Sequence, residues 1–157
     1  DFATAFFQAS MKSSPNAEEP RRHMEAVLIQ TLTGKAERDK KVHLRIVDID
    51  RDLLRIDPFN PFARKNLAEA LYNSGFQDEA KREMLRATEV EPNYVPAYLR
   101  LADWYRESGN TDESAAFRNR AFSVAAQYQN LQPTERYESL ILGRPDPQMS
   151  QGQAVRQ

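Results

Sequence analysis

The chain has 157 residues, a formal net charge of −1 and no cysteine. This length fits one domain with a substantial core. The balanced charge gives no general attraction to nucleic acid or to an anionic membrane, and the lack of cysteine excludes disulfides, thiolate zinc sites and cysteine nucleophiles. No apolar run approaches the roughly 20 residues that span a bilayer, so we expect no membrane insertion by this segment. Because the sequence starts at an aspartate, we interpret it as part of a longer or processed protein.

Residues 1–19 are expected to form a helix followed by a loop. Phenylalanine is frequent in this helix, and Ser13 to Pro20 has the composition of a loop. Exposed aromatic side chains on a terminal helix often mark an interface. Phe2, Phe6 and Phe7 are therefore candidate contacts for a homodimer.

Residues 20–57 are predicted to form a pair of helices. The first, Arg21 to Thr33, has Pro20 at its start and Gly34 at its end. The second, Lys35 to Asp57, has apolar residues at alternating steps of four and three. A short part, Val42 to Ile49, also alternates like a strand, but the long uninterrupted stripe favours a helix. The stripe consists of Val42, Ile46, Ile49, Leu53 and Ile56.

Residues 58–128 contain two copies of a 34-residue repeat. A glycine at the end of each first helix can adopt a left-handed conformation, and a pair of acids opens each second helix. The residues that match at this spacing are Pro58 with Pro92, Leu67 with Leu101, Ala68 with Ala102, Gly75 with Gly109, Asp78 with Asp112, Glu79 with Glu113, and Ala87 with Ala121.

Apolar stripes run along the four helices of these two repeats, and we expect them to form the core. In the first copy they contain Leu67, Ala68 and Leu71, followed by Ala80, Met84, Leu85 and Ala87. In the second they contain Tyr98, Leu101, Ala102 and Tyr105, followed by Ala115, Phe117, Ala121, Phe122 and Ala125.

Residues 129–145 are expected to form a capping helix. Thr134 can cap it, Tyr137, Leu140 and Ile141 share one side, and Gly143 ends it. Such a helix would cover the exposed side of the last repeat, as the end of a solenoid requires. Residues 146–157 are polar and are expected to be disordered.

No set of residues indicates catalysis, a cofactor or a metal site. His23 and His43 have no recognisable nucleophile or orienting acid, and we expect both to be surface or structural residues. Asp48, Asp50 and Asp52 resemble the start of a calcium loop, but the required glycine and glutamate are missing. A solvated acidic face explains these aspartates better. We therefore predict that the chain is not an enzyme.

With its 34-residue period and these matching residues, the chain resembles the tetratricopeptide-repeat (TPR) proteins. The resemblance implies an all-α solenoid of antiparallel helix pairs: one degenerate pair, two clear repeats and the capping helix. It also implies a concave groove that binds a protein or peptide. The groove residues expected by position are Phe62, Lys65, Glu69, Tyr72, Leu99, Asp103 and Arg106.

Two functional hypotheses follow. The first is a protein- or peptide-binding scaffold domain within a larger protein. The alternative is a homo-oligomerisation domain, which could belong to a bacterial envelope or glycan-assembly membrane protein. Trp104 lies off the apolar stripe of its helix and is either a partner contact or a packed residue. The sequence fits either cytoplasm or periplasm.

Overall fold

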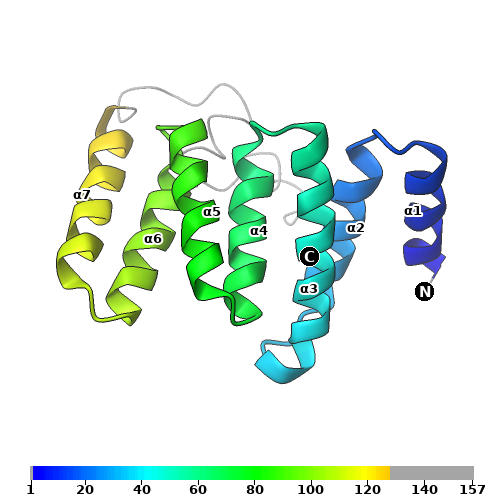
Figure 1. The fold of residues 1–157 in the computed structure, drawn as a ribbon, viewed down its shortest axis with the longest axis horizontal. Helices are drawn as coiled ribbons and strands as arrows, with labels where there is room; N and C mark the ends of the chain where they lie inside the picture. Colours follow the sequence, from blue (N-terminus) through cyan, green and yellow to red (C-terminus); the bar gives the residue numbers. More distant parts are fainter. Residues whose placement is uncertain (1, 128–157) are drawn as a thin grey trace, which may run out of the picture. The chain divides into compact units, whose positions relative to one another are not determined.

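The computed structural model describes residues 2–127, and within this range it contains seven α-helices and no strand (Figure 1). The helices belong to two compact units, Asp1–Val90 and Glu91–Gln157. The predicted all-α class is confirmed. The first unit contains α1 (Phe2–Ser13), α2 (Glu19–Gln30), α3 (Ala36–Ile56), α4 (Pro61–Asn73) and α5 (Gln77–Val90), and the second contains α6 (Val95–Glu107) and α7 (Thr111–Gln127).

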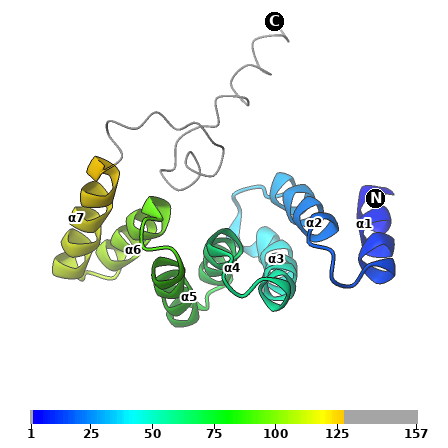
Figure 2. The ribbon, with the colours of Figure 1, turned by 90° about the horizontal axis from the view of Figure 1, so that it is seen from above.

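The helices of the first unit pack in chain order, each against the next (Figures 1 and 2). The uninterrupted stripe of α3 correctly indicated one long helix rather than a strand. Each fully buried leucine or methionine stabilises the fold by about 1.5–3 kcal/mol relative to an exposed one. Buried side chains of this unit are Met24, Leu28, Ile46, Leu53, Leu67, Ala68, Leu71, Ala80, Met84 and Ala87.

The ends of α4 show why the repeat has its period. The side chain of Asn60 accepts hydrogen bonds from the backbone N–H groups of Phe62 and Ala63, at 3.1 and 3.0 Å, which satisfies two donors at the helix start. Gly75 has a φ of 94°, and the Phe76 N–H then donates to the Leu71 carbonyl at 2.9 Å. This is the glycine-dependent helix ending that the sequence predicted.

The same ending recurs 34 residues later in the second unit. Gly109 has a φ of 81°, and the Asn110 N–H donates to the Tyr105 carbonyl at 2.9 Å. Because both glycines adopt a conformation that other residues rarely reach, the repeat has a conformational cause as well as a packing one. Within this unit α6 packs against α7, around Val95, Tyr98, Ala121 and Val124.

The apolar side of α7 was predicted only in part. Ala121 is buried and Phe117 is partly buried, as expected, but Ala115 and Phe122 are exposed, Phe122 to 60%. The buried stripe instead includes Ser114 and Val124. Positions 115 and 122 are seven residues apart and share a face that is turned away from α6. The sequence pattern did not show which of the two adjacent faces would pack.

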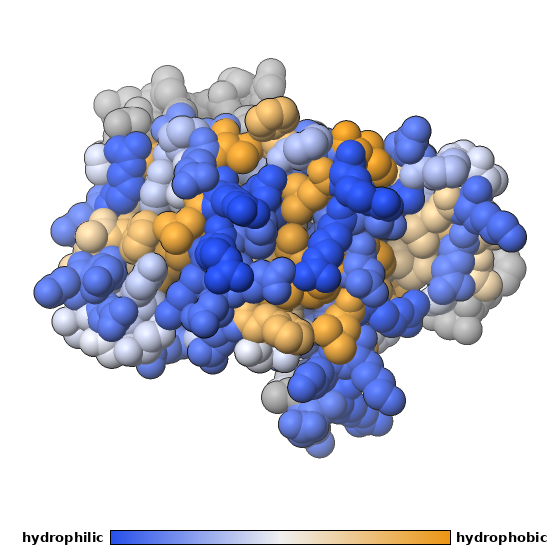
Figure 3. All heavy atoms as spheres, in the orientation of Figure 1, coloured by the Kyte–Doolittle hydropathy of each residue, from blue (hydrophilic) through white to orange (hydrophobic). Residues whose placement is uncertain are grey.

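The predicted capping helix at 129–145 and the tail at 146–157 lie outside the described residues. In the part that is described, no helix is long and apolar enough to cross a membrane. The start of α3 projects as a hydrophilic end (Figure 3), where Lys35, Glu37, Arg38, Lys40 and Lys41 are exposed. This agrees with a solvated helix face.

Candidate functional site

Besides Asp39 near the start of α3, two acidic side chains of the first unit are buried. Glu25 on α2 is 7% exposed and Asp50 on α3 is 0% exposed. Asp50 is four residues after Ile46 and three before Leu53, so the helical spacing places it on the buried stripe of α3. Buried carboxyl groups are rare unless they are paired, and these two lie outside the sequence-predicted site.

Glu25 has a partner on the facing helix. The Asn66 amide on α4 donates a hydrogen bond to Glu25 Oε1 at 2.7 Å. Burial raises the pKa of Glu25 above its ordinary value, while the hydrogen bond from Asn66 and the positive charges of Lys65 and Arg22 oppose the rise. Burial thus disfavours the charged form of Glu25, and its polar neighbours favour it.

Asp50 has no such partner. Neither of its carboxyl oxygens finds a hydrogen bond among the described residues. Burial is the main cause that raises the pKa of Asp50 to about 9, and repulsion from Glu25 is the second. Attraction to Lys65 opposes the rise only in part. Asp50 therefore keeps its proton at neutral pH and stands as a neutral acid behind Glu25.

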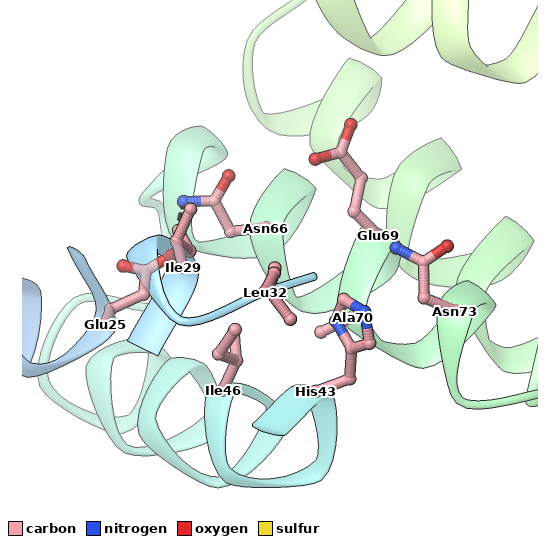
Figure 4. Close-up of a pocket in the computed structure, with 9 residues that line it drawn as sticks. All are labelled: Glu25, Ile29, Leu32, His43, Ile46, Asn66, Glu69, Ala70 and Asn73. Atoms are coloured by element: carbon pink, nitrogen blue, oxygen red, sulfur yellow. Dashed lines mark hydrogen bonds between the residues drawn. The ribbon is translucent and has the colours of Figure 1, made fainter. Parts of the chain in front are cut away.

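A pocket of ≈ 130 Å³ opens between α2, α3 and α4 (Figure 4). Its apolar wall consists of Ile29 and Leu32 from α2 and the turn after it, Ile46 from α3, and Ala70 from α4. Polar groups complete the lining: Glu25, His43, Asn66, Glu69 and Asn73. An apolar pocket with a few convergent polar groups is the usual form of a binding site.

The polar groups of this pocket come from all three helices. In Figure 4 the Glu25 carboxylate meets the Asn66 amide on one side, and the Glu69 carboxylate extends on the other. Burial lowers the pKa of His43, against the attraction of Asp39, so this imidazole is neutral at pH 7. The titratable groups that line the pocket are thus two acids and one neutral histidine.

A second cavity shares part of this wall. Its volume is ≈ 160 Å³, and Glu25 and Asn66 line it together with Phe62 and Leu53. The hydrogen-bonded pair therefore contributes to both cavities on the same face of α4.

The structure places the predicted groove residues of α4 at these cavities or beside them. Glu69 lines the first cavity and Phe62 lines the second. Lys65 forms an ion pair of 2.8 Å with Glu69, although it lines neither cavity. Tyr72 is partly buried and is also absent from both walls.

The predicted groove residues of the second unit lie on α6. Leu99 is 38% exposed. Asp103 forms ion pairs with Arg106 at 3.0 Å on its own helix and with Arg118 at 3.5 Å on α7. Within this unit, these charges therefore join the two helices of one repeat.

The candidate interface residues differ in exposure. Phe6 is 58% exposed, and its ring meets that of Phe7 edge-on at 5.5 Å. Phe7 stacks on His23 of α2 at 5.5 Å, so it packs within the chain. Trp104 is only 2% exposed, which agrees with packing rather than with a partner contact. The side chain of Phe2 lies outside the described part.

Sequence reasoning missed the buried pair. It treated Asp48, Asp50 and Asp52 as one solvated acidic face, which holds for the exposed Asp48 and is wrong for Asp50. The signal was present, because Asp50 continues the helical spacing of Ile46 and Leu53. Among residues 2–127, no group of three or more histidines and acids could hold a metal ion.

No protein-family model matches the sequence. Among curated proteins, the TPR repeat-containing thioredoxin TTL4 of Arabidopsis thaliana is 38% identical over 61 residues. That stretch represents 39% of this chain and 9% of the thioredoxin. The local identity is in keeping with a shared repeat, and it covers little of the longer protein.

Several solved structures share the fold. A TPR protein of Thermus thermophilus superposes with a TM-score of 0.64 at 20% identity, covering 88% of this chain and 71% of that one. MamA MSR-1 superposes with a TM-score of 0.63 at 20% sequence identity. A double mutant of MamA RS-1 superposes with a TM-score of 0.68 at 13% sequence identity. These cover 79% and 81% of this chain, and 66% of each MamA chain. Likeness at such low identity shows the fold alone.

Proposed function

We propose that this tetratricopeptide-repeat fold is a protein- or peptide-binding scaffold within a larger protein, and that the first unit binds its ligand at the pocket between α2, α3 and α4. The observation that carries the proposal is this pocket, in which an apolar wall meets two carboxylates and two amides. Helical-repeat proteins commonly bind partners on the surface that their stacked helices create.

A peptide fits the dimensions of this site better than a free metabolite does. A pocket of ≈ 130 Å³ is smaller than the 300–1,000 Å³ that is usual for a small-molecule site. It can hold one side chain, while the rest of an extended or helical segment lies along the helices. The second cavity of ≈ 160 Å³ shares its wall and offers a place for another side chain of the same segment.

A displayed library of random twelve-residue peptides, selected on the full chain, tests this proposal. Ile29 is 47% exposed and lines the pocket, so Ile29→Arg should fill the pocket with a long cationic side chain without disturbing the core. Leu44→Arg is the matched control, because Leu44 is 38% exposed on α3 and does not line the pocket. We expect selected peptides to bind the wild type and Leu44→Arg but not Ile29→Arg.

Two results would contradict the proposal. One is a selection that enriches no peptide above the background of an uncoated surface. The other is a set of enriched peptides that bind Ile29→Arg as tightly as the wild type. Circular dichroism of both variants provides the control that their helices are intact.

One observation favours a second candidate function, homo-oligomerisation through α1. Phe6 exposes 58% of its surface on this terminal helix and lies against Phe7. Light scattering after size exclusion tests it: Phe6→Ser should convert a dimer into a monomer. Phe59→Ser, at a position 76% exposed between α3 and α4, is the control. A wild-type chain that is monomeric throughout the accessible concentration range excludes this function.

A further inference from the structure

The pocket between α2, α3 and α4 has an uneven charge. Its wall contains the carboxylates of Glu25 and Glu69, and neither lysine nor arginine belongs to the lining. His43 is neutral at pH 7 because burial lowers its pKa. Electrostatic complementarity therefore favours a cationic occupant over an anionic or neutral one.

The size and polarity of the pocket match one long basic side chain. At about 30 Å³ per water molecule, ≈ 130 Å³ has room for about four waters. Ile29, Leu32 and Ile46 provide an apolar wall for a methylene stem, and such stems pack well while their charged ends stay among polar groups. The side-chain NH2 group of Asn66 donates to Glu25, and the side-chain carbonyl oxygen of Asn66 can accept a hydrogen bond from a ligand.

We propose that this pocket receives a lysine or arginine side chain of the partner peptide, whose charged group lies between Glu25 and Glu69. This inference rests on the proposed function and specifies the ligand chemistry of the same site.

The surroundings of Glu25 support this assignment. Asp50 faces it from α3 as a neutral acid, while Arg22 on its own helix and Lys65 on α4 attract it. Arg22 is engaged with Glu18 at 2.6 Å, and Lys65 with Glu69 at 2.8 Å. The Asp50 carboxyl has no hydrogen-bond partner in the described chain, and as a neutral acid it adds no charge beside Glu25. Because both cations near Glu25 already pair with other acids, a cation from a partner would add a positive charge directly beside its carboxylate.

Lys65 lies beside the pocket and pairs with one of its two acids. Its ammonium group contacts Glu69 at 2.8 Å, and both side chains are about one quarter exposed. A basic side chain that enters the pocket must share Glu69 with Lys65 or displace it. Removing the Lys65 charge should therefore strengthen binding of a basic peptide, although it removes an ion pair from the free protein.

The test uses the peptides selected on the full chain. In each one, lysine is replaced by norleucine and arginine by citrulline, which retain the length of the side chain and remove its charge. We expect one such replacement to weaken binding to the wild type about tenfold or more, since truncating one side of a desolvated charge pair costs at least that much. In the variants Glu25→Gln and Glu69→Gln, the same replacement should weaken peptide binding about threefold or less. Asp48→Asn, an exposed acid on α3, is the control and should behave as the wild type.

A second arm examines Lys65. Lys65→Met should bind the charged peptides about threefold more tightly, a change of the size expected when a competing surface ion pair is removed. Lys40→Met, at an exposed position near the start of α3, should not change binding.

The outcomes separate the two proposals. The cation assignment is wrong if the peptides that depend on the pocket lack a basic residue. It is also wrong if neutral replacement of the basic residue weakens their binding by less than about threefold. Either result leaves the scaffold function standing. Unchanged or weaker binding by Lys65→Met also counts against the assignment. Failure to enrich any peptide overturns the scaffold function, and the cation assignment with it.

Discussion

The amide of Asn66 on α4 donates a hydrogen bond of 2.7 Å to the Glu25 carboxylate on α2, and the two residues are 41 positions apart in the chain. The bond satisfies a carboxylate that is nearly removed from water. It also links two helices that do not follow one another, with α3 between them in the sequence.

Asn66→Ala should therefore destabilise the fold. The substitution leaves a buried acceptor without its donor, which costs about 1–3 kcal/mol. Urea unfolding measures the change. Asn73→Ala is the matched control, since Asn73 is exposed at the end of the same helix, and it should change stability by about 0.5 kcal/mol or less. Equal effects of the two substitutions would show that the bond to Glu25 contributes nothing.

Asp50 should make the fold less stable as the pH rises. Its pKa is about 9 in the folded chain and 3.8 in the reference state, so the folded chain holds a proton that the unfolded chain releases between these values. The free energy of unfolding then falls with pH through this window, by at most about 1.4 kcal/mol per pH unit. Glu25 acts in the same direction because its pKa is also raised.

Thermal unfolding at pH 5, 6, 7 and 8 measures this dependence, and Asp50→Leu should reduce it. The leucine has no proton to lose, and an apolar group suits the position between Ile46 and Leu53. We also expect Asp50→Leu to be more stable than the wild type at pH 8. Asp48→Leu, at an exposed position of α3, should retain the wild-type slope. The account fails if the slope is the same in both variants.

Asp39 should have the opposite pH dependence. Its carboxylate accepts hydrogen bonds from the backbone N–H and the hydroxyl of Thr33, the N–H bonds at 3.0 and 2.9 Å, and from the Gly34 N–H at 2.7 Å. Although burial opposes it, these bonds lower the pKa of Asp39. A lowered pKa means that the stabilisation is present above the ordinary value and is lost as the pH falls through the folded one.

Asp39→Ala should accordingly lower the melting temperature at pH 7, and its effect should shrink as the pH falls through the lowered pKa of the wild-type carboxylate. Glu37→Ala in the same turn of α3, at an exposed position, is the control. A loss of melting temperature that stays the same at every acidic pH would show that the substitution acts through helix propensity rather than through the charge.

Leu101 and Phe122 should differ sharply in their importance for stability. Leu101 is 0% exposed, so Leu101→Ala should cost about 2–5 kcal/mol through lost burial and the cavity that remains. Phe122 is 60% exposed, so Phe122→Ser should change stability by about 0.5 kcal/mol or less. Chemical denaturation of the two variants provides the comparison. A large loss for Phe122→Ser would show that another segment covers this ring.

Much of the fold was predictable because its determinants are local. The glycine that ends α4 and its counterpart after α6 need only their own conformational freedom to stop a helix. The acids that open α5 and α7 act through nearby backbone N–H groups. Interactions that involve a few consecutive residues repeat whenever the sequence repeats, so the period of 34 residues was visible without coordinates.

The candidate site depends on contacts between helices that are distant in sequence. Helical spacing alone could place Asp50 on the buried stripe of α3, but it could not show that Glu25 faces it or that Asn66 completes the arrangement. These relations depend on how α2, α3 and α4 cross and on the rotation of each helix about its axis. For the same reason, the sequence assigned Phe122 to the packed side of α7, whereas the packing rotated it into solvent. Local sequence thus determined where the helices begin and end, and tertiary packing decided which of their faces meet and which acids are buried.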